Sequence, residues 1–217
     1  MTEPLPVYLE VGTKRVFACA LDWPGWARSG RDEGAALDAL LAYRDRYAAV
    51  VARAGVQLPG AVAVDVVERL VGNATTDFGA PGVPPATDAR TLNAEDLARL
   101  TKLLVASWEA FDKATAAASG AVLRVGPRGG GRSLARIEAH VPDAEAMYLG
   151  ALGSRTPRPG GWAAQRKTVL ATLTAVAQGR PVPDPSKTHR RWSPRFFVRR
   201  AASHILDHAW EIEDRSW

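Results

Sequence analysis

The segment RFFVRRAASHILDHAWEIEDRSW, residues Arg195–Trp217, has the spacing of apolar residues expected of one amphipathic helix. Two of the chain's four histidines, His204 and His208, lie in it four residues apart. On a helix this spacing stacks both imidazoles on one face, about one turn apart. Such a pair can chelate a metal ion, or it can be two hydrogen-bonded histidines at the core margin, and the pair alone does not decide. Five charged residues of this helix are expected to point more outward: Arg199, Arg200, Asp207, Asp214 and Arg215.

A third histidine, His140, precedes a second predicted helix. It lies in the stretch LARIEAHVPDAEAMYL, residues 134–149. The apolar side of that helix is expected to consist of Ala144, Met147, Tyr148 and Leu152. Pro142 follows His140 closely and has no backbone N–H, so we expect the helix to kink or restart just after the histidine.

These two histidine-bearing segments resemble the DinB/YfiT-like four-helix bundles over about residues 90–217, in the motifs LARIEAHVPDAEAMYL and HILDHAWEIEDR. In that family one histidine of the second helix and an HxxxH pair of the last helix form a three-histidine metal site. The resemblance therefore implies His140, His204 and His208 as metal ligands. It implies a divalent ion such as zinc, nickel or iron. It also implies a thiol-dependent transferase, with mycothiol, bacillithiol or glutathione as the thiol, or a hydrolase.

A site with three histidines would be chemically reactive, because structural metal sites more often use four protein ligands. The open position would hold water or substrate, and the ion would lower the pKa of a bound water or thiol. Four nearby acids could fix the imidazole tautomers by hydrogen bonding: Glu138, Asp207, Glu211 and Asp214. We assign Glu211, three residues after His208, and Asp207 as the candidate catalytic residues. The alternative for all four acids is ordinary surface charge.

A basic cluster that could bind an anion lies at the start of the last helix, interleaved with Trp192, Phe196 and Phe197. Its members are Lys187, Arg190, Arg191, Arg195, Arg199 and Arg200. We assign Arg195 and Arg199 in this cluster as residues that bind an anionic substrate or thiol. The alternative is a solvated loop and helix start. His189, in the preceding Pro-rich loop, is expected to face solvent, or else to serve as an acid or base near the site.

The composition is that of an ordinary folded domain, with 217 residues of which 47% are hydrophobic and 24% charged. No apolar run reaches the ~20 residues needed to cross a bilayer, and the first residues lack the pattern of a signal peptide. Cys19 is the only cysteine, so no disulfide can form within the chain and a cytoplasmic location is expected. The net charge of +5 is compatible with an acidic partner.

The N-terminal part, residues 1–72, is predicted to be a small α/β domain with a short antiparallel sheet. Strands are expected over residues 6–12, 14–21 and 61–70, with one helix over 32–55 and a turn-rich stretch over 22–30. The order of these elements and the motifs DWPGW and SGRDEG resemble HicB-like domains over about residues 7–70. That resemblance implies a noncatalytic interaction module.

The fold class that follows is α+β, with a small N-terminal HicB-like α/β unit and a C-terminal DinB-like four-helix bundle over residues 93–217. Residues 73–92 are predicted to be a linker loop without a helix or strand. Helices are expected over 93–118 and 161–179, in addition to the two that carry histidines. The glycine-rich stretch over 120–132 is predicted to be a hinge or lid over the metal site, with phosphate binding as a minor alternative.

Two functions of different classes fit these patterns. The first is a metal-dependent enzyme, a thiol-dependent transferase or a hydrolase, acting on a small, anionic substrate. The second is a noncatalytic module that binds protein or nucleic acid and carries a degenerate metal site. The first is favoured, so nucleic acid is the less favoured partner, no membrane partner is expected, and a homodimer is one option for assembly.

Overall fold

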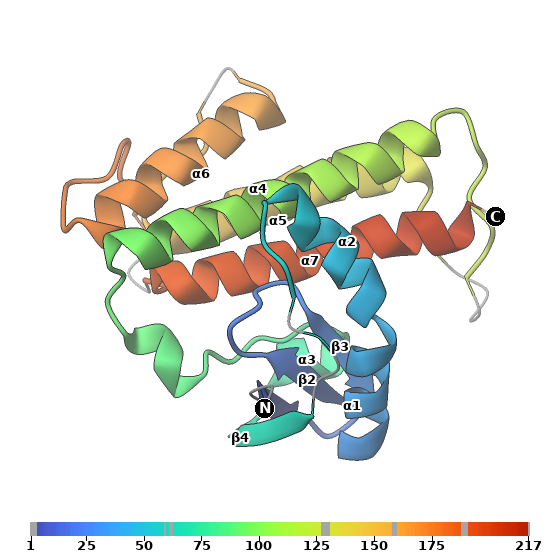
Figure 1. Cartoon of the computed structure of the whole chain (residues 1–217). Coiled ribbons are helices and arrows are strands. Elements are labelled where there is room, and N and C mark those ends of the chain that lie inside the picture. The colour runs from blue at the N-terminus through green and yellow to red at the C-terminus, as the bar shows by residue number, and fades with distance from the viewer. Residues whose placement is uncertain are drawn as a thin grey trace. The chain divides into compact units, whose positions relative to one another are not determined.

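A four-stranded sheet and seven α-helices make up the described part of the chain, which confirms the predicted α+β class. The computed structural model divides into two units, Met1–Arg90 and Thr91–Trp217 (Figure 1). None of the described helices combines the length and the hydropathy that a membrane crossing requires. The structure describes residues 4–58, 60, 63–126, 131–157, 160–187 and 191–216.

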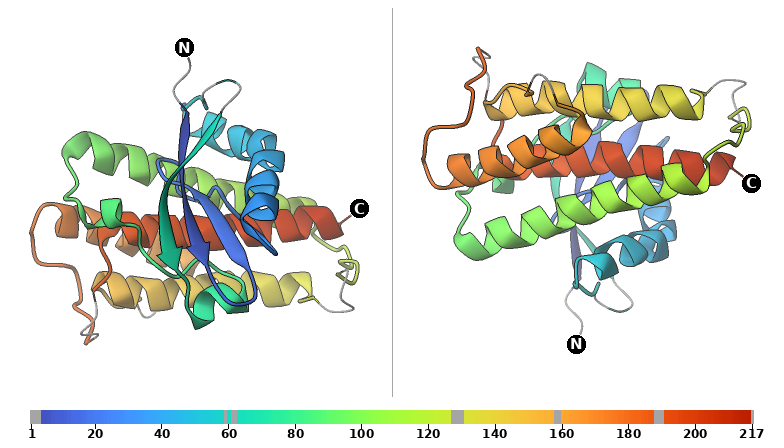
Figure 2. Two further views of the ribbon diagram at one scale, coloured as in Figure 1. Left: turned by 90° about the horizontal axis from the view of Figure 1, so that it is seen from below. Right: turned by 90° about the horizontal axis from the view of Figure 1, so that it is seen from above.

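The sheet of the first unit has the strand order β3-β2-β1-β4 (Figure 2). Its strands are β1 (Leu5–Val11), β2 (Val16–Ala20), β3 (Ala27–Gly30) and β4 (Val64–Val71). β1, β2 and β3 pair antiparallel, whereas β4 pairs parallel to β1. The prediction of an antiparallel sheet is therefore wrong for β4. The two helices that separate β4 from β3 form a crossover, and this returns the chain in the direction of β1.

The helix predicted over residues 32–55 consists of two helices, α1 (Glu33–Ala42) and α2 (Arg44–Arg53). The break lies at Tyr43, whose ψ is 4°. The carbonyl of Leu40, which would accept from residue 44 in a continuous helix, accepts instead from Tyr43 N and from Trp26 Nε1 at 2.8 Å. The indole of Trp26 thus takes the place of a backbone donor in the hydrogen-bond pattern of the helix. The sequence pattern does not predict this contact.

The prediction of a helix-free linker over residues 72–92 is also wrong. This segment contains α3 (Ala74–Phe78) and a 3₁₀ turn, Ala86–Ala89. Asn73 starts α3 with a reciprocal capping box formed with Thr76. The buried carboxylate of Glu10 on β1 accepts hydrogen bonds from Thr76 Oγ1 and from the backbone N–H groups of Gly82 and Val83. Burying this carboxylate requires such donors, and they bind the segment to the sheet.

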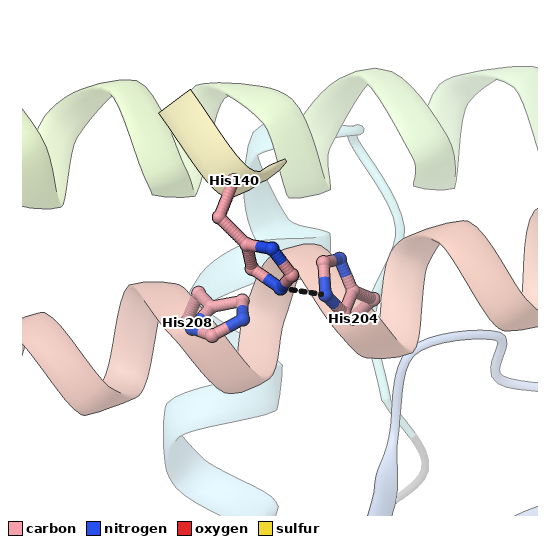
Figure 3. A group of neighbouring side chains, drawn as sticks. All are labelled: His140, His204 and His208. Atoms are coloured by element: carbon pink, nitrogen blue, oxygen red, sulfur yellow. Dashed lines mark hydrogen bonds between the residues drawn. The ribbon is translucent and has the colours of Figure 1, made fainter. Parts of the chain in front are cut away.

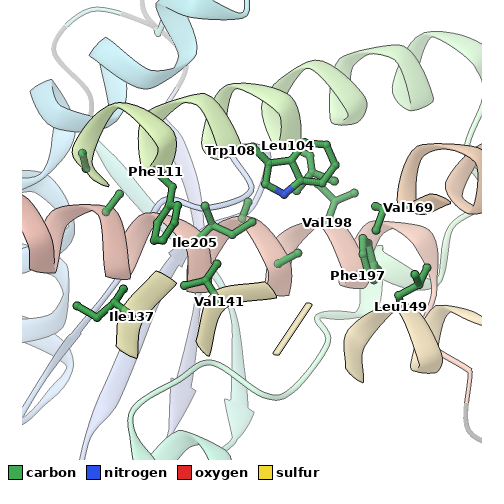
Figure 4. Packing of buried hydrophobic residues seen from close by; sticks show 14 of the residues in the cluster. Leu104, Trp108, Phe111, Ile137, Val141, Leu149, Val169, Phe197, Val198 and Ile205 are labelled. Atoms are coloured by element: carbon green, nitrogen blue, oxygen red, sulfur yellow. The ribbon is translucent and has the colours of Figure 1, made fainter. Parts of the chain in front are cut away.

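The second unit consists of four helices that lie alongside one another around one core (Figure 2, right). They are α4 (Ala94–Ala117), α5 (Leu134–Leu152), α6 (Trp162–Ala177) and α7 (Pro194–Arg215). Asn93 caps α4, and its side chain accepts from Asp96 N at 2.7 Å. The core brings aromatic and aliphatic side chains of α4, α5 and α7 together (Figure 4), among them Trp108, Phe111, Ile137, Val141, Phe197, Val198 and Ile205.

α5 differs from its prediction in two respects. The helix begins at Leu134 and continues through Pro142, so His140 lies within it and not before it. Proline at this position removes the hydrogen bond to the carbonyl of Glu138. Glu138 is exposed, so solvent can replace the lost donor, and the helix is not interrupted. Met147, predicted on the apolar side, is 68% exposed.

Candidate metal centre

Three imidazoles from two helices converge in the second unit. His140 comes from α5, and His204 and His208 come from successive turns of α7 (Figure 3). One ligand-capable nitrogen of each ring lies within 4.8 Å of those of the other two. The Nε2 atoms of His140 and His204 are 3.2 Å apart. The three residues that the family resemblance implies as metal ligands therefore lie close together in the fold.

The packing of α5 fixes the direction of His140. Ile137, Val141 and Ala144 on neighbouring positions are fully or almost fully buried in the core, which sets the rotation of the helix about its axis. His140 lies at the edge of this apolar face and points toward α7 (Figure 3). The direction of His204 and His208 is fixed in a similar way. Their i, i+4 spacing places them on one face of α7, and the burial of Ala201, Ile205 and Ala209 sets the rotation of that helix.

A chain of hydrogen bonds fixes the Nδ1 side of the His208 ring. Its Nδ1 lies 2.8 Å from Glu211 Oε2, and the other oxygen of Glu211 accepts from Arg215 Nη1. Arg215 is anchored in turn, because its Nε donates to the carbonyl of Arg124 at 2.7 Å. The hydrogen bond with His208 is the main cause that lowers the pKa of Glu211. An ionised Glu211 accepts the Nδ1 proton of a neutral His208, which leaves Nε2 as the atom with a free lone pair.

The surroundings keep the other two imidazoles neutral. Burial is the main cause that lowers the pKa of His204 to about 2, and the charge of Arg200 adds to it. Burial and then the charge of Arg132 lower the pKa of His140. Metal ligation requires deprotonated imidazole nitrogens, so both side chains are in their ligand form at neutral pH.

The spacing of the nitrogens fits a shared metal ion. Two imidazole nitrogens that ligate one tetrahedral ion at 2.0–2.1 Å are about 3.3 Å apart, and the His140–His204 separation is 3.2 Å. A hydrogen bond between two neutral imidazoles has a similar length. That bond uses one lone pair and one proton, and it does not account for the third imidazole, whose ring centroid lies 4.7 Å from that of His204 and 5.1 Å from that of His140.

The remaining predicted site residues are not gathered in this way. Asp207 is exposed and does not belong to the group of converging ligand atoms in the described residues. Arg195 forms an ion pair with Asp96 and so joins α7 to α4, nine residues, or about 13 Å along the helix, before His204. His189 and residues 127–130 of the predicted lid lie outside the described residues.

The expectation that five charged residues of α7 face outward is only partly correct. Asp207 and Asp214 are exposed, but Arg199, Arg200 and Arg215 are at most 9% exposed. Long arginine stems cover apolar surface while the guanidinium groups find polar or aromatic contacts. For Arg215 that contact is Glu211, and for Arg200 it is the ring of Tyr148, 4.9 Å from the guanidinium carbon.

Two further residues lie beside the histidines, Tyr148 and Arg200, although the sequence placed Tyr148 on the apolar side of its helix and Arg200 among the outward-facing charges of α7. The ring of Tyr148 meets that of His204 edge-on at 5.8 Å between centroids. Burial raises the pKa of the Tyr148 phenol, which is therefore neutral at physiological pH. Helical spacing could have placed Arg200 beside the histidines, because Arg200 precedes His204 by four residues.

Comparison of the chain with protein-family models, with curated proteins and with solved structures finds no match.

Proposed function

We propose that the second unit binds one divalent metal ion through His140, His204 and His208 and uses it in catalysis, as the DinB/YfiT-like bundles do. The observation that carries this proposal is the convergence of three imidazole nitrogens from two rigid helices. The hydrogen bond from His208 to Glu211 supports it, because metal-binding histidines almost always donate their second ring N–H to a carboxylate, a carbonyl or water.

Imidazole ligands suit zinc, nickel and iron, and all three remain candidates. A bound ion would act as a Lewis acid and lower the pKa of a water or thiol at its open position. The residues of the chain provide the setting for that chemistry. Three imidazoles bound as neutral ligands would leave the full positive charge of the ion to the substrate, and Glu211 would hold His208 through Nδ1 with Nε2 free.

The reaction class we favour is transfer to or from a low-molecular-weight thiol, with hydrolysis as the second candidate. The first unit, HicB-like in its sequence, serves in this proposal as a noncatalytic interaction module. The reaction class rests on the DinB/YfiT-like resemblance together with the histidine geometry, and the role of the first unit rests on the HicB-like resemblance alone.

The test is an activity screen of protein reconstituted with zinc, nickel or iron(II). Electrophilic substrates are offered with mycothiol, bacillithiol or glutathione, and thiol consumption is measured. Ester and amide substrates without thiol test hydrolysis. We expect turnover with one metal that is lost in His208→Ala and retained in Glu138→Gln, an exposed position on α5. If the wild type is as inactive as His208→Ala with every metal, thiol and substrate, the catalytic function is wrong.

A further inference from the structure

The guanidinium group of Arg200 on α7 lies next to the histidine cluster. Arg200 precedes His204 by one helical turn and so lies on nearly the same face of α7 as the histidine pair. Its side chain is 9% exposed, and its guanidinium group lies against the Tyr148 ring that meets His204. The stacking on Tyr148 fixes the guanidinium group beside the histidine cluster.

The charge of Arg200 is not neutralised within the described chain. Its Nη1 atom is buried and has no hydrogen-bond partner, and no ion pair of Arg200 is found among the described residues. A buried guanidinium group remains charged at every physiological pH, and an unpaired buried donor is destabilising. A ligand or an ordered water can complete such a group.

The charge of Arg200 lies beside the candidate metal centre, one helical turn before His204 on α7. A divalent ion held by the three histidines would add a second positive charge there. This combination favours negatively charged ligands.

We propose that Arg200 is an oxyanion subsite next to the three-histidine centre, so that the substrate carries a carboxylate or a phosphate group. This inference rests on the proposed function for the identity of the neighbouring centre. Within the basic cluster predicted from the sequence, it moves the anion-binding role from Arg195 and Arg199 to Arg200, whose guanidinium group has an unused donor. A charge-assisted hydrogen bond to Nη1 holds the oxyanion, and the metal centre then faces the rest of the substrate.

The experiment uses full-length protein loaded with Co²⁺ and freed of excess metal. Acetate and inorganic phosphate are titrated in separate arms, and binding is followed by the cobalt absorption spectrum and by the melting temperature. The variants are Arg200→Gln and Arg200→Lys. Arg136→Gln is the matched control, because it removes an exposed charge from α5 four residues before His140. The affinity for Co²⁺ is measured separately for each protein.

We expect saturable binding of at least one anion, weakened about 10-fold or more in Arg200→Gln and less in Arg200→Lys, as for the loss of a hydrogen bond to a charged group. The affinity for Co²⁺ should change little. The tighter of the two anions identifies the carboxylate or phosphate class. Equal anion affinity in the wild type and Arg200→Gln, or an equal loss in Arg136→Gln, overturns the subsite.

A failure of the metal proposal gives a different result. If the wild type binds no Co²⁺, the same titrations are run on metal-free protein with the melting temperature as the readout. Stabilisation by an anion that depends on Arg200 then supports the subsite while the metal centre is rejected. Absence of any stabilisation that depends on Arg200 rejects the subsite as well.

Discussion

Replacement of Glu211 by glutamine tests how the fold prepares His208 for a metal. Glu211 accepts the Nδ1 proton of His208 at 2.8 Å and is itself bound by Arg215. Glutamine retains the size and one acceptor oxygen but removes the negative charge. The Nε2–H tautomer of His208, which blocks the ligand atom with a proton, becomes more populated, and one of the two groups bound to Glu211 meets an amide NH₂ instead of an oxygen.

The expected loss of Zn²⁺ affinity follows from the hydrogen bond of Glu211 to Nδ1 of His208, the proposed ligand. Removing the partner of a metal-binding histidine typically lowers metal affinity by 10–100-fold, or about 1.4–2.7 kcal/mol. Glu211 is partly buried, so its charge is less screened than that of a surface acid. We therefore expect Glu211→Gln to weaken Zn²⁺ binding by about 10-fold and Glu211→Ala by more.

The assay is competition for Zn²⁺ against a chromophoric chelator at pH 7.5, with urea unfolding of the metal-free proteins to exclude a folding defect. Glu138→Gln is the control, since it makes the same chemical change on the exposed side of α5, two residues from His140. Zinc affinities of Glu211→Gln and Glu138→Gln that agree within twofold would refute the role of Glu211 in orienting His208.

Three further predictions concern stability. The pKa of His204, about 2, lies below its unfolded value of about 6.5, so folding disfavours the proton and stability is lost as pH falls below about 6.5. From pH 7 to pH 5 in a chelator, the wild type should lose about 2 kcal/mol more than His204→Asn by urea unfolding; equal losses would contradict the shift. Glu145 accepts from Trp108 Nε1 at 2.7 Å in the core, so Glu145→Gln should cost about 1–3 kcal/mol by leaving a donor unpaired. Adding Trp108→Phe should recover part of that cost, and strict additivity in the double-mutant cycle would argue against the hydrogen bond between Trp108 and Glu145. The Arg195–Asp96 pair is partly exposed, and its double-mutant cycle should give a coupling of about 1 kcal/mol or less with no change in metal affinity; a change in metal affinity would show that Arg195 acts at the site.

The histidine site was predictable because its elements depend on local spacing. The i, i+4 pair of α7 and the i+3 position of Glu211 follow from helical geometry once the helix is recognised, and Asn93 marks the start of α4 in the same way. His140 was named through the family resemblance, and the packing of α5 against α7 brings it to the pair.

What the sequence missed depends on contacts between distant residues. The break at Tyr43 arises because Trp26, 14 residues before Leu40, binds the Leu40 carbonyl. α3 is held by the carboxylate of Glu10, more than 60 residues away in the chain. Arg200 has a helical position that indicates a solvated face, yet it is buried against Tyr148. Helical periodicity records the average environment of a position, and it does not report such pairings.

The most direct measurement for the central claim is the metal content of protein purified without a histidine tag, beside the His204→Ala variant. Each of the three imidazoles lies against the other two, and the loss of His204 leaves a pair from separate helices. The three-histidine centre predicts about one divalent ion per chain in the wild type and none in the variant. No bound metal in either protein, even after incubation with zinc, nickel and iron(II), would contradict it.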